Sequence, residues 1–207
     1  MKITKDRKAA ILGFWLPVVC LGVLCGVPVT AQAAKTHITM VPRLVAPPEG
    51  KALVNIFRVG GQGPFGADIR IPIFDESGKF LMDLPKKSEC QLVFEPGTKS
   101  LITWFQSNPI NVVTLELAPN KTYDLVFDVS IWKGGSFLVP LSQAPHDLQN
   151  REKIESDRIK YVYALERDDV ALNFESSQKA HIEQIKADFL GGKKSDRVVH
   201  VGKDDCR

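Results

Sequence analysis

The chain has 207 residues, of which 44% are hydrophobic and 25% are charged, and its formal net charge is +3. This composition is that of an ordinary folded protein and excludes a disordered chain. The first 33 residues carry four basic and one acidic side chain, so the remainder has 23 of each. A neutral chain has no bulk positive field to release counterions from a nucleic acid. We therefore expect no nucleic-acid partner.

Residues 1–33 have the three parts of an export signal. A basic start is followed by an apolar run over residues 9–29 and by Ala31-Gln32-Ala33, whose small side chains suit a signal peptidase. The sequence predicts cleavage after Ala33 and an exported protein, periplasmic or extracellular. The apolar run also approaches the ~20 residues that span a bilayer. An uncleaved inner-membrane anchor over residues 9–29 is the alternative, and is the only membrane contact that we expect.

Residues 34–50 contain Pro42, Pro47 and Pro48 and show no sustained period. Proline fixes its own φ and pushes the preceding residue toward extended backbone. This stretch is therefore predicted to be an extended tether or a loosely docked first strand.

From residue 51 onward, short runs of β-branched and aromatic residues are separated by turn residues. In residues 121–131, apolar and polar side chains alternate, with Val126 as the exception, which is typical of a strand with one face toward a core. Tight reversals such as residues 75–78 and 95–97 favour antiparallel pairing of consecutive strands. The expected strands are residues 51–59, 67–74, 79–84, 89–94, 99–106, 110–117, 121–131 and 136–141. We expect a mainly β fold, an antiparallel β-sandwich of seven or eight strands over residues 51–143.

Residues 144–207 are more charged and are predicted to form a mixed helical and strand appendage. A core of ~60 residues is marginal alone, so we expect this α/β appendage to dock on the sandwich. Within residues 176–190, Ile182, Ile185 and Phe189 recur at helical spacing, after a serine pair that would cap the helix and before Gly191-Gly192, which would end it. Elsewhere we expect a helix over residues 146–156, strands over residues 160–165 and 197–201, and a helix start or turn at Asp168-Asp169.

Two cysteines, Cys90 and Cys206, follow the export signal. An oxidising compartment permits a disulfide between them, which would stabilise the fold by constraining the unfolded chain. The other interpretation is a free thiol in the core, because Cys90 is in phase with Leu92 and Phe94 on the inward side of a strand. Both interpretations stay open at this point.

Residues 61–66 match the dinucleotide-binding string G-x-G-x-x-G. That site also needs a helix to begin at the string, because the helix N-terminus holds the pyrophosphate. The residues that follow alternate as a strand instead, so we expect no dinucleotide. A flexible loop over residues 60–66, including Gly61, Gly63 and Phe65, is the interpretation, and such a loop can serve as a contact site.

Two tryptophans complete this candidate ligand or partner surface. Trp104 is out of phase with Leu101 and Phe105, so one of these rings is expected to point away from the core. An outward Trp104 or Trp132 can form a platform for a ligand, or can pack under the C-terminal appendage.

No arrangement of residues typical of catalysis or metal binding is found. The histidines lack the close spacing of a metal pair, and the nearest cluster, His200 with Asp204, Asp205 and Cys206, is typical of a solvated tail. There is no serine on a strand-to-helix elbow. We therefore expect no catalytic residues, no metal and no cofactor.

Three segments resemble a known family: residues 51–58 (KALVNIFR), 94–101 (FEPGTKSL) and 115–125 (LELAPNKTYDL). They are similar to the strands and turns of exported bacterial proteins of unknown function with a carboxypeptidase-regulatory-like or PEGA-like β-sandwich, over about residues 51–142. The sequence departs from that family at Lys99 or Ser100, where histidine is common, and at Asn120, where glycine is usual. The resemblance implies a sandwich and export, and carries no catalytic residues.

Taken as a whole, the sequence predicts a non-enzymatic cell-envelope protein. Its sandwich would be a binding or structural module for another envelope protein or a cell-wall component. The alternative is a small-ligand or carbohydrate-binding module that uses the exposed aromatic residues together with residues 60–66.

Overall fold

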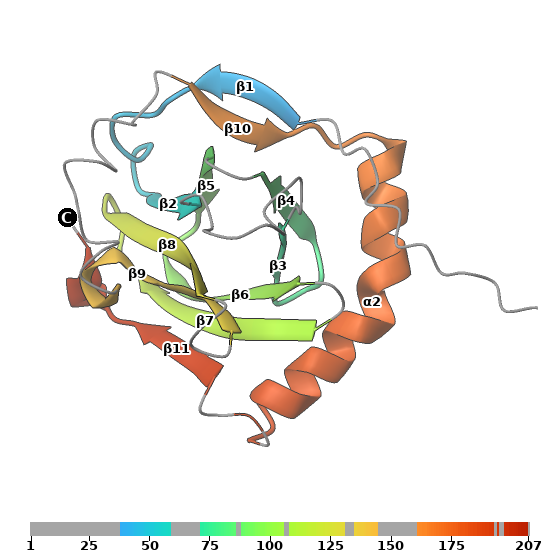
Figure 1. Ribbon diagram of the computed structural model, residues 1–207. Coiled ribbons are helices and arrows are strands. Elements are labelled where there is room, and N and C mark those ends of the chain that lie inside the picture. Colours follow the sequence, from blue (N-terminus) through green and yellow to red (C-terminus); the bar gives the residue numbers. More distant parts are fainter. Residues whose placement is uncertain are drawn as a thin grey trace, which may run out of the picture. The chain divides into compact units, whose positions relative to one another are not determined.

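Two β-sheets organise the chain in the computed structural model, which describes residues 38–58, 71–85, 88–105, 108–130, 135–144, 161–192, 194 and 197–206 (Figure 1). All of these residues belong to one compact unit, Ala33–Arg207. The predictions for residues 1–37, for the loop over residues 60–66 and for a helix over residues 146–156 lie outside the described residues.

Most of the described elements are strands, and α2 is the long helix among them. The bounds are β1 Ile38–Pro42, β2 Ala52–Arg58, β3 Ile71–Asp75, β4 Phe80–Leu84, β5 Ser88–Phe94, β6 Gly97–Phe105, β7 Asn108–Leu117, β8 Thr122–Ser130, β9 Gly135–Pro140, η2 Leu141–Gln143, β10 Tyr161–Leu165, α2 Asp169–Phe189, β11 Val198–Val201 and η4 Lys203–Asp205. The first sheet has six strands in the order β1-β10-β5-β2-β8-β9, and the second has five in the order β11-β7-β6-β3-β4.

The main core lies between the two sheets. Alternate residues of β8, namely Tyr123, Leu125 and Phe127, are fully buried in this core, as their period-two pattern predicts. Val126 is buried on the opposite face of β8, where it packs with Phe57 and Ala144 in a smaller cluster. The exception in the alternation therefore marks a position where the outer face of the sheet is also covered.

The expected antiparallel sandwich is correct in its two-layer, mainly β architecture and wrong in its pairing. Three pairs are parallel: β2 with β8, β10 with β5, and β11 with β7. The tight turns do produce antiparallel neighbours, as in β3–β4 and β6–β7. However, the turns after β5 and β7 lead from one sheet into the other, and the strands brought together in this way need not run in opposite directions.

Residues from beyond position 160 take part in both sheets. The expected strand over residues 160–165 is confirmed as β10, which lies between β1 and β5, and that over residues 197–201 is confirmed as β11, which pairs with β7. The stretch over residues 34–50 contributes β1, which pairs with β10 along its full length. The C-terminal segment thus contributes a strand to each sheet.

The long helix α2 covers the outer face of the five-stranded sheet (Figure 1). The expected stripe of Ile182, Ile185 and Phe189 is buried there. The expected start at the serine pair is wrong: Asp168 caps the helix, and its carboxylate accepts a hydrogen bond of 2.9 Å from the Ala171 N–H. The serines lie inside the helix, where the Ser177 hydroxyl donates to the carbonyl oxygen of Phe174 at 2.7 Å. The opposing apolar residues of the sheet are Phe74, Phe80, Ile102 and Val112.

One side chain joins the two sheets where β7 meets β9. The amide of Asn111 in β7 donates to the carbonyl oxygen of Leu138 at 2.8 Å and accepts from the Leu138 N–H at 3.1 Å. Both residues are fully buried. A side-chain amide that bonds both main-chain groups of one residue replaces a neighbouring strand at that position. Asn111 therefore closes the junction between the sheets.

Candidate functional site

Residues 43–47, which we call the strap, follow β1 in the chain and precede β2. The strap crosses the outer face of the six-stranded sheet. Gln91 of β5 holds the strap through both main-chain groups of Leu44: the Leu44 N–H donates to Oε1 at 2.7 Å, and Nε2 donates to the Leu44 carbonyl at 3.0 Å. Arg43 forms an ion pair of 2.5 Å with Glu89, and these side chains are only 16% and 11% exposed. The strap is thus bound to the sheet as a fixed segment.

A row of polar side chains continues from Gln91 across the sheet. Asn55 of β2 is in register with Gln91 on one side and with Asp124 of β8 on the other. Gln91 Nε2 donates to Asn55 Oδ1 at 2.9 Å, and Asn55 Nδ2 donates to Asp124 Oδ1 at 2.6 Å. Gln91 and Asn55 each donate one hydrogen bond in the direction of β8. Hydrogen bonds in a chain polarise one another, and the final acceptor of this chain is the carboxylate of Asp124.

A cleft of about 490 Å³ opens beside the strap. Besides the strap it is lined by Leu53 and Asn55 of β2, and by Asn120 and Thr122 around the start of β8. Its volume lies within the range of ~300 to 1,000 Å³ that is typical of ligand sites. Asn120 Oδ1 accepts from the Gly50 N–H at 2.7 Å. Within the described residues, neither the Asn120 NH₂ group nor the Thr122 hydroxyl bonds to another protein group. Both groups are therefore available to bond a ligand in the cleft.

Exposed apolar side chains gather around the strap. Of the large apolar residues that are exposed in the described chain, four lie on β1, the strap and β5, and the others lie on or next to α2. Val45 is 99% exposed although its neighbour Leu44 is tied to the sheet. The four residues are Met40, Leu44, Val45 and Val93. Val45 is therefore an apolar side chain exposed to solvent on a stretch of backbone that the sheet holds through Leu44.

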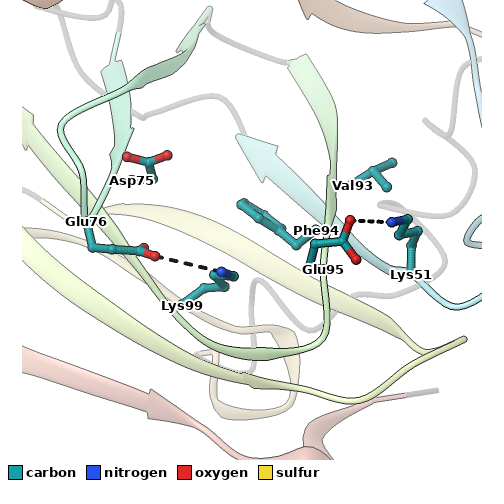
Figure 2. A pocket seen from close by; sticks show the side chains of 7 residues that line it. All are labelled: Lys51, Asp75, Glu76, Val93, Phe94, Glu95 and Lys99. Atoms are coloured by element: carbon teal, nitrogen blue, oxygen red, sulfur yellow. Dashed lines mark hydrogen bonds and ion pairs between the residues drawn. The ribbon is translucent and has the colours of Figure 1, made fainter.

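A second hollow, of about 260 Å³, lies where β5 turns into β6 and β3 into β4 (Figure 2). Figure 2 shows Lys51 pointing toward Glu95 and Lys99 pointing toward Glu76. Lys51 bonds Glu95, Lys99 Nζ lies 3.9 Å from Glu76, and Glu76 also accepts from the Ser100 N–H at 2.9 Å. These groups bind each other across the turns. We interpret this hollow as a set of turn contacts, in which exposed ion pairs contribute little stability.

A buried arginine lies at the end of β2 away from both hollows. The guanidinium of Arg58 donates to the carbonyl oxygen of Leu84 at 2.7 Å, and the side chain is almost fully buried. Burial lowers the pKa of Arg58, and the nearby carboxylate of Asp83 opposes that shift. The charge therefore serves to connect β2 with β4 in the interior.

The residues predicted as a partner surface fall largely outside the described part of the chain. Gly61, Gly63, Phe65 and Trp132 lie in undescribed residues. Trp104 lies in β6, in register with Pro109 of β7, and its side chain is outside what the structure describes.

The structure does not bring Cys90 and Cys206 together, and both are free thiols. Cys90 lies in β5, whereas Cys206 bridges to Tyr123 of β8, so β2 and β8 separate them. Three strand spacings of ~4.8 Å amount to about 14 Å, whereas a disulfide needs Cα atoms within ~7 Å. Cys90 is fully buried in the core, and burial, with a smaller contribution from Glu89, raises the pKa of its thiol.

In the described part of the chain, no three His, Cys, Asp or Glu side chains are placed to hold a metal ion. Asp205 accepts instead from the Gly202 N–H at 2.9 Å and lies 3.3 Å from the Ser142 hydroxyl. None of the described helices has the length and apolarity needed to cross a membrane.

Comparison with protein-family models and with curated protein sequences finds no match. The resemblance to carboxypeptidase-regulatory-like and PEGA-like sandwiches stays a prediction. The strap cleft itself was not found from the sequence, because its residues are spread over the strap, β2 and the start of β8. The available signal was weak: Asn55 and Gln91 are polar residues within otherwise apolar strands.

Proposed function

We propose that this chain is an exported, non-enzymatic module of the bacterial cell envelope that binds another envelope protein or a cell-wall component. The export pattern of residues 1–33 and the resemblance to exported sandwich proteins support the location. One observation carries the binding role: Leu44 and Val45 are presented to solvent on a strap that Gln91 and Arg43 fix to the sheet.

The surroundings of the strap fit a protein interface. Binding interfaces combine a small apolar centre with a polar rim. Here the exposed Val45 is flanked by the Arg43–Glu89 pair. A backbone that is already fixed loses little conformational entropy when a partner binds, so more of the contact energy appears as affinity.

Site-specific crosslinking in the native envelope tests this role. A photoreactive amino acid placed at Val45 is expected to give a discrete adduct with one envelope component. The same amino acid at Leu172, an exposed apolar position on α2, is the matched control and should give none. Equal adduct patterns at the two positions, or no adduct at Val45, would contradict a binding face at the strap.

The export component has its own test. The N-terminus of the protein isolated from its host is expected to be Ala34. Protein that retains residues 1–33 would support the membrane-anchored alternative over residues 9–29.

The second candidate is a small-ligand or carbohydrate-binding module. In the sequence, Trp104, Trp132 and residues 60–66 indicate such a module. In the structure, the cleft of about 490 Å³ beside the strap favours it. Titration with a peptide and with a sugar oligomer distinguishes this candidate from protein binding.

A further inference from the structure

The strap shows how the outer face of the six-stranded sheet binds an extended peptide. One side-chain amide, that of Gln91, bonds the N–H and the C=O of Leu44 at 2.7 and 3.0 Å. Main-chain groups are the same in every sequence, so this contact recognises extended backbone and not a particular side chain. The sheet face therefore already holds one segment of polypeptide through its main chain.

The cleft beside the strap continues this surface with the same chemistry. Thr122 brings a hydroxyl that can both donate and accept, and Asn120 brings an NH₂ group that can donate to a carbonyl. Neither group is used by another residue of the described chain. Val45, Ala46 and Pro47 of the strap add apolar surface to the same cleft. A lining with both polar groups and apolar surface suits an extended chain, which offers main-chain groups and side chains alternately.

The lining also restricts the ligand's charge. Of the lining residues that the structure describes, only Arg43 is charged, and its guanidinium is bound to Glu89. The same described residues include no aromatic ring on which a sugar could stack. Small polar and apolar side chains therefore fit this cleft better than charged ones.

We propose that the cleft binds an extended, uncharged polypeptide segment of the partner protein, laid beside the strap and held through its main chain by Thr122 and Asn120. This proposal rests on the proposed function and names the form in which the partner binds. The strap then serves as one wall of the site, and its exposed Val45 contacts side chains of the same partner segment.

The test uses the exported protein and two probes. Random decapeptides displayed on phage are selected on the protein, and the selected peptide is then synthesised and titrated by NMR. A tetramer of N-acetylglucosamine is titrated in parallel. We expect the peptide, and not the tetramer, to shift the amide signals of residues 43–46, 53–55 and 120–122.

Two conservative variants test the named groups. Thr122→Val keeps a β-branched residue in β8 and removes the hydroxyl. Asn120→Gly keeps the backbone conformation, since glycine readily adopts the φ of 59° found there, and removes the amide. Each is expected to weaken peptide binding roughly five- to tenfold, the equivalent of one hydrogen bond. Thr114→Val, on β7 of the other sheet, is the matched control and should leave the affinity unchanged.

The outcomes separate this proposal from the proposed function. Shifts with the tetramer alone, or peptide binding that Thr122→Val and Asn120→Gly leave unchanged, would overturn the extended-peptide proposal. If the Val45 crosslink persists in that case, the binding function stands with a different ligand. Loss of both the crosslink and the peptide shifts would overturn both.

Discussion

The hydroxyl of Tyr123 donates a hydrogen bond of 3.1 Å to the carbonyl oxygen of Glu116. The same hydroxyl accepts one of 2.9 Å from the Ala118 N–H. Tyr123 is fully buried in the core at the start of β8, so its ring packs between the sheets while its hydroxyl fixes the turn from β7. This is the arrangement called a tyrosine corner in β-sandwiches. It fixes the point at which the chain leaves one sheet for the other.

Replacing Tyr123 by Phe is expected to lower the free energy of unfolding by about 1 to 3 kcal/mol, because the Glu116 and Ala118 groups lose their partner. Urea denaturation measures the change. Tyr163→Phe, in β10, is the matched control because no described residue bonds the Tyr163 hydroxyl. A loss of the same size in both variants would show that the hydroxyl of Tyr123 has no special role.

Burial also raises the pKa of Tyr123, so the folded state favours the neutral phenol. A group with a raised folded pKa contributes stability that is fully present below its unfolded pKa of ~10 and is lost as the pH rises through the folded value. We expect stability to fall above about pH 10, and to fall less steeply in Tyr123→Phe than in Tyr163→Phe. Equal slopes would contradict this assignment.

Asn111→Ala is expected to be among the most destabilising substitutions of a polar residue. It leaves the buried N–H and C=O of Leu138 without partners, at a cost of roughly 2 to 4 kcal/mol. Thr114→Ala, on the same strand, is the control, with an expected change below about 1 kcal/mol. Urea denaturation again provides the measurement, and similar midpoints for the two variants would contradict the role of Asn111 in closing the sheets.

Gln91 provides a graded test of the strap. Gln91→Ala removes both bonds to Leu44, and we expect the Leu44 amide to exchange its hydrogen roughly tenfold faster or more. Gln91→Glu keeps an acceptor for the Leu44 N–H and loses the donor to the Leu44 carbonyl. Its exchange rate at the Leu44 amide should therefore lie between those of the unaltered protein and of Gln91→Ala. Hydrogen exchange monitored by NMR gives these rates. A strap that exchanges at the same rate in all three proteins is not held by Gln91.

The two thiols are expected to differ in reactivity. The thiolate is the reactive form, and burial both excludes reagent from Cys90 and raises the pKa of its thiol. An aromatic disulfide reagent should therefore modify Cys206 in the native protein and Cys90 only after unfolding. Cys206→Ser assigns the two phases. A native protein that gains two mass units on reduction would instead reveal the disulfide.

The edge of the five-stranded sheet is covered at Phe80. Glu175 accepts from the Phe80 N–H at 2.8 Å, and Arg167 donates to the Phe80 carbonyl at 3.1 Å. Open strand edges pair with other chains. The double variant Arg167→Ala/Glu175→Ala is therefore expected to self-associate, as measured by analytical ultracentrifugation.

A matched control exists on the same helix. Glu183 and Lys186 form an ion pair of 3.0 Å that does not contact β4 through any described hydrogen bond. Glu183→Ala/Lys186→Ala should remain at the sedimentation coefficient of the unaltered protein. Self-association of both double variants would point to loss of helix charge as the cause.

Local patterns predicted the elements well. The alternation in residues 121–131 places Tyr123, Leu125 and Phe127 in the core, and the spacing of Ile182, Ile185 and Phe189 places the inner face of α2. Such patterns depend on neighbours within a few residues, and are therefore visible in one sequence. The helix start was misplaced because the serine pair has the same capping preference as Asp168, and only the fold decides between them.

Pairing and the candidate site depend on residues far apart in the chain. Asn55 and Asp124 are 69 positions apart, and nothing in their local surroundings indicates that β2 and β8 run side by side. The same holds for Gln91 and Leu44, 47 positions apart. Long-range registers of this kind are set by how two layers close over one core, and a single sequence does not show that closure.

The position of β10 and β11 has a consequence for the order of folding. The six-stranded sheet lacks its β1–β10 ribbon, and the five-stranded sheet lacks β11, until residues 161–201 are available. Contacts between strands so distant in the chain form slowly, because a long loop must close first. The two sheets are therefore completed only when residues 161–201 join them. A chain that stops before position 161 would lack a strand inside the first sheet and an edge strand of the second.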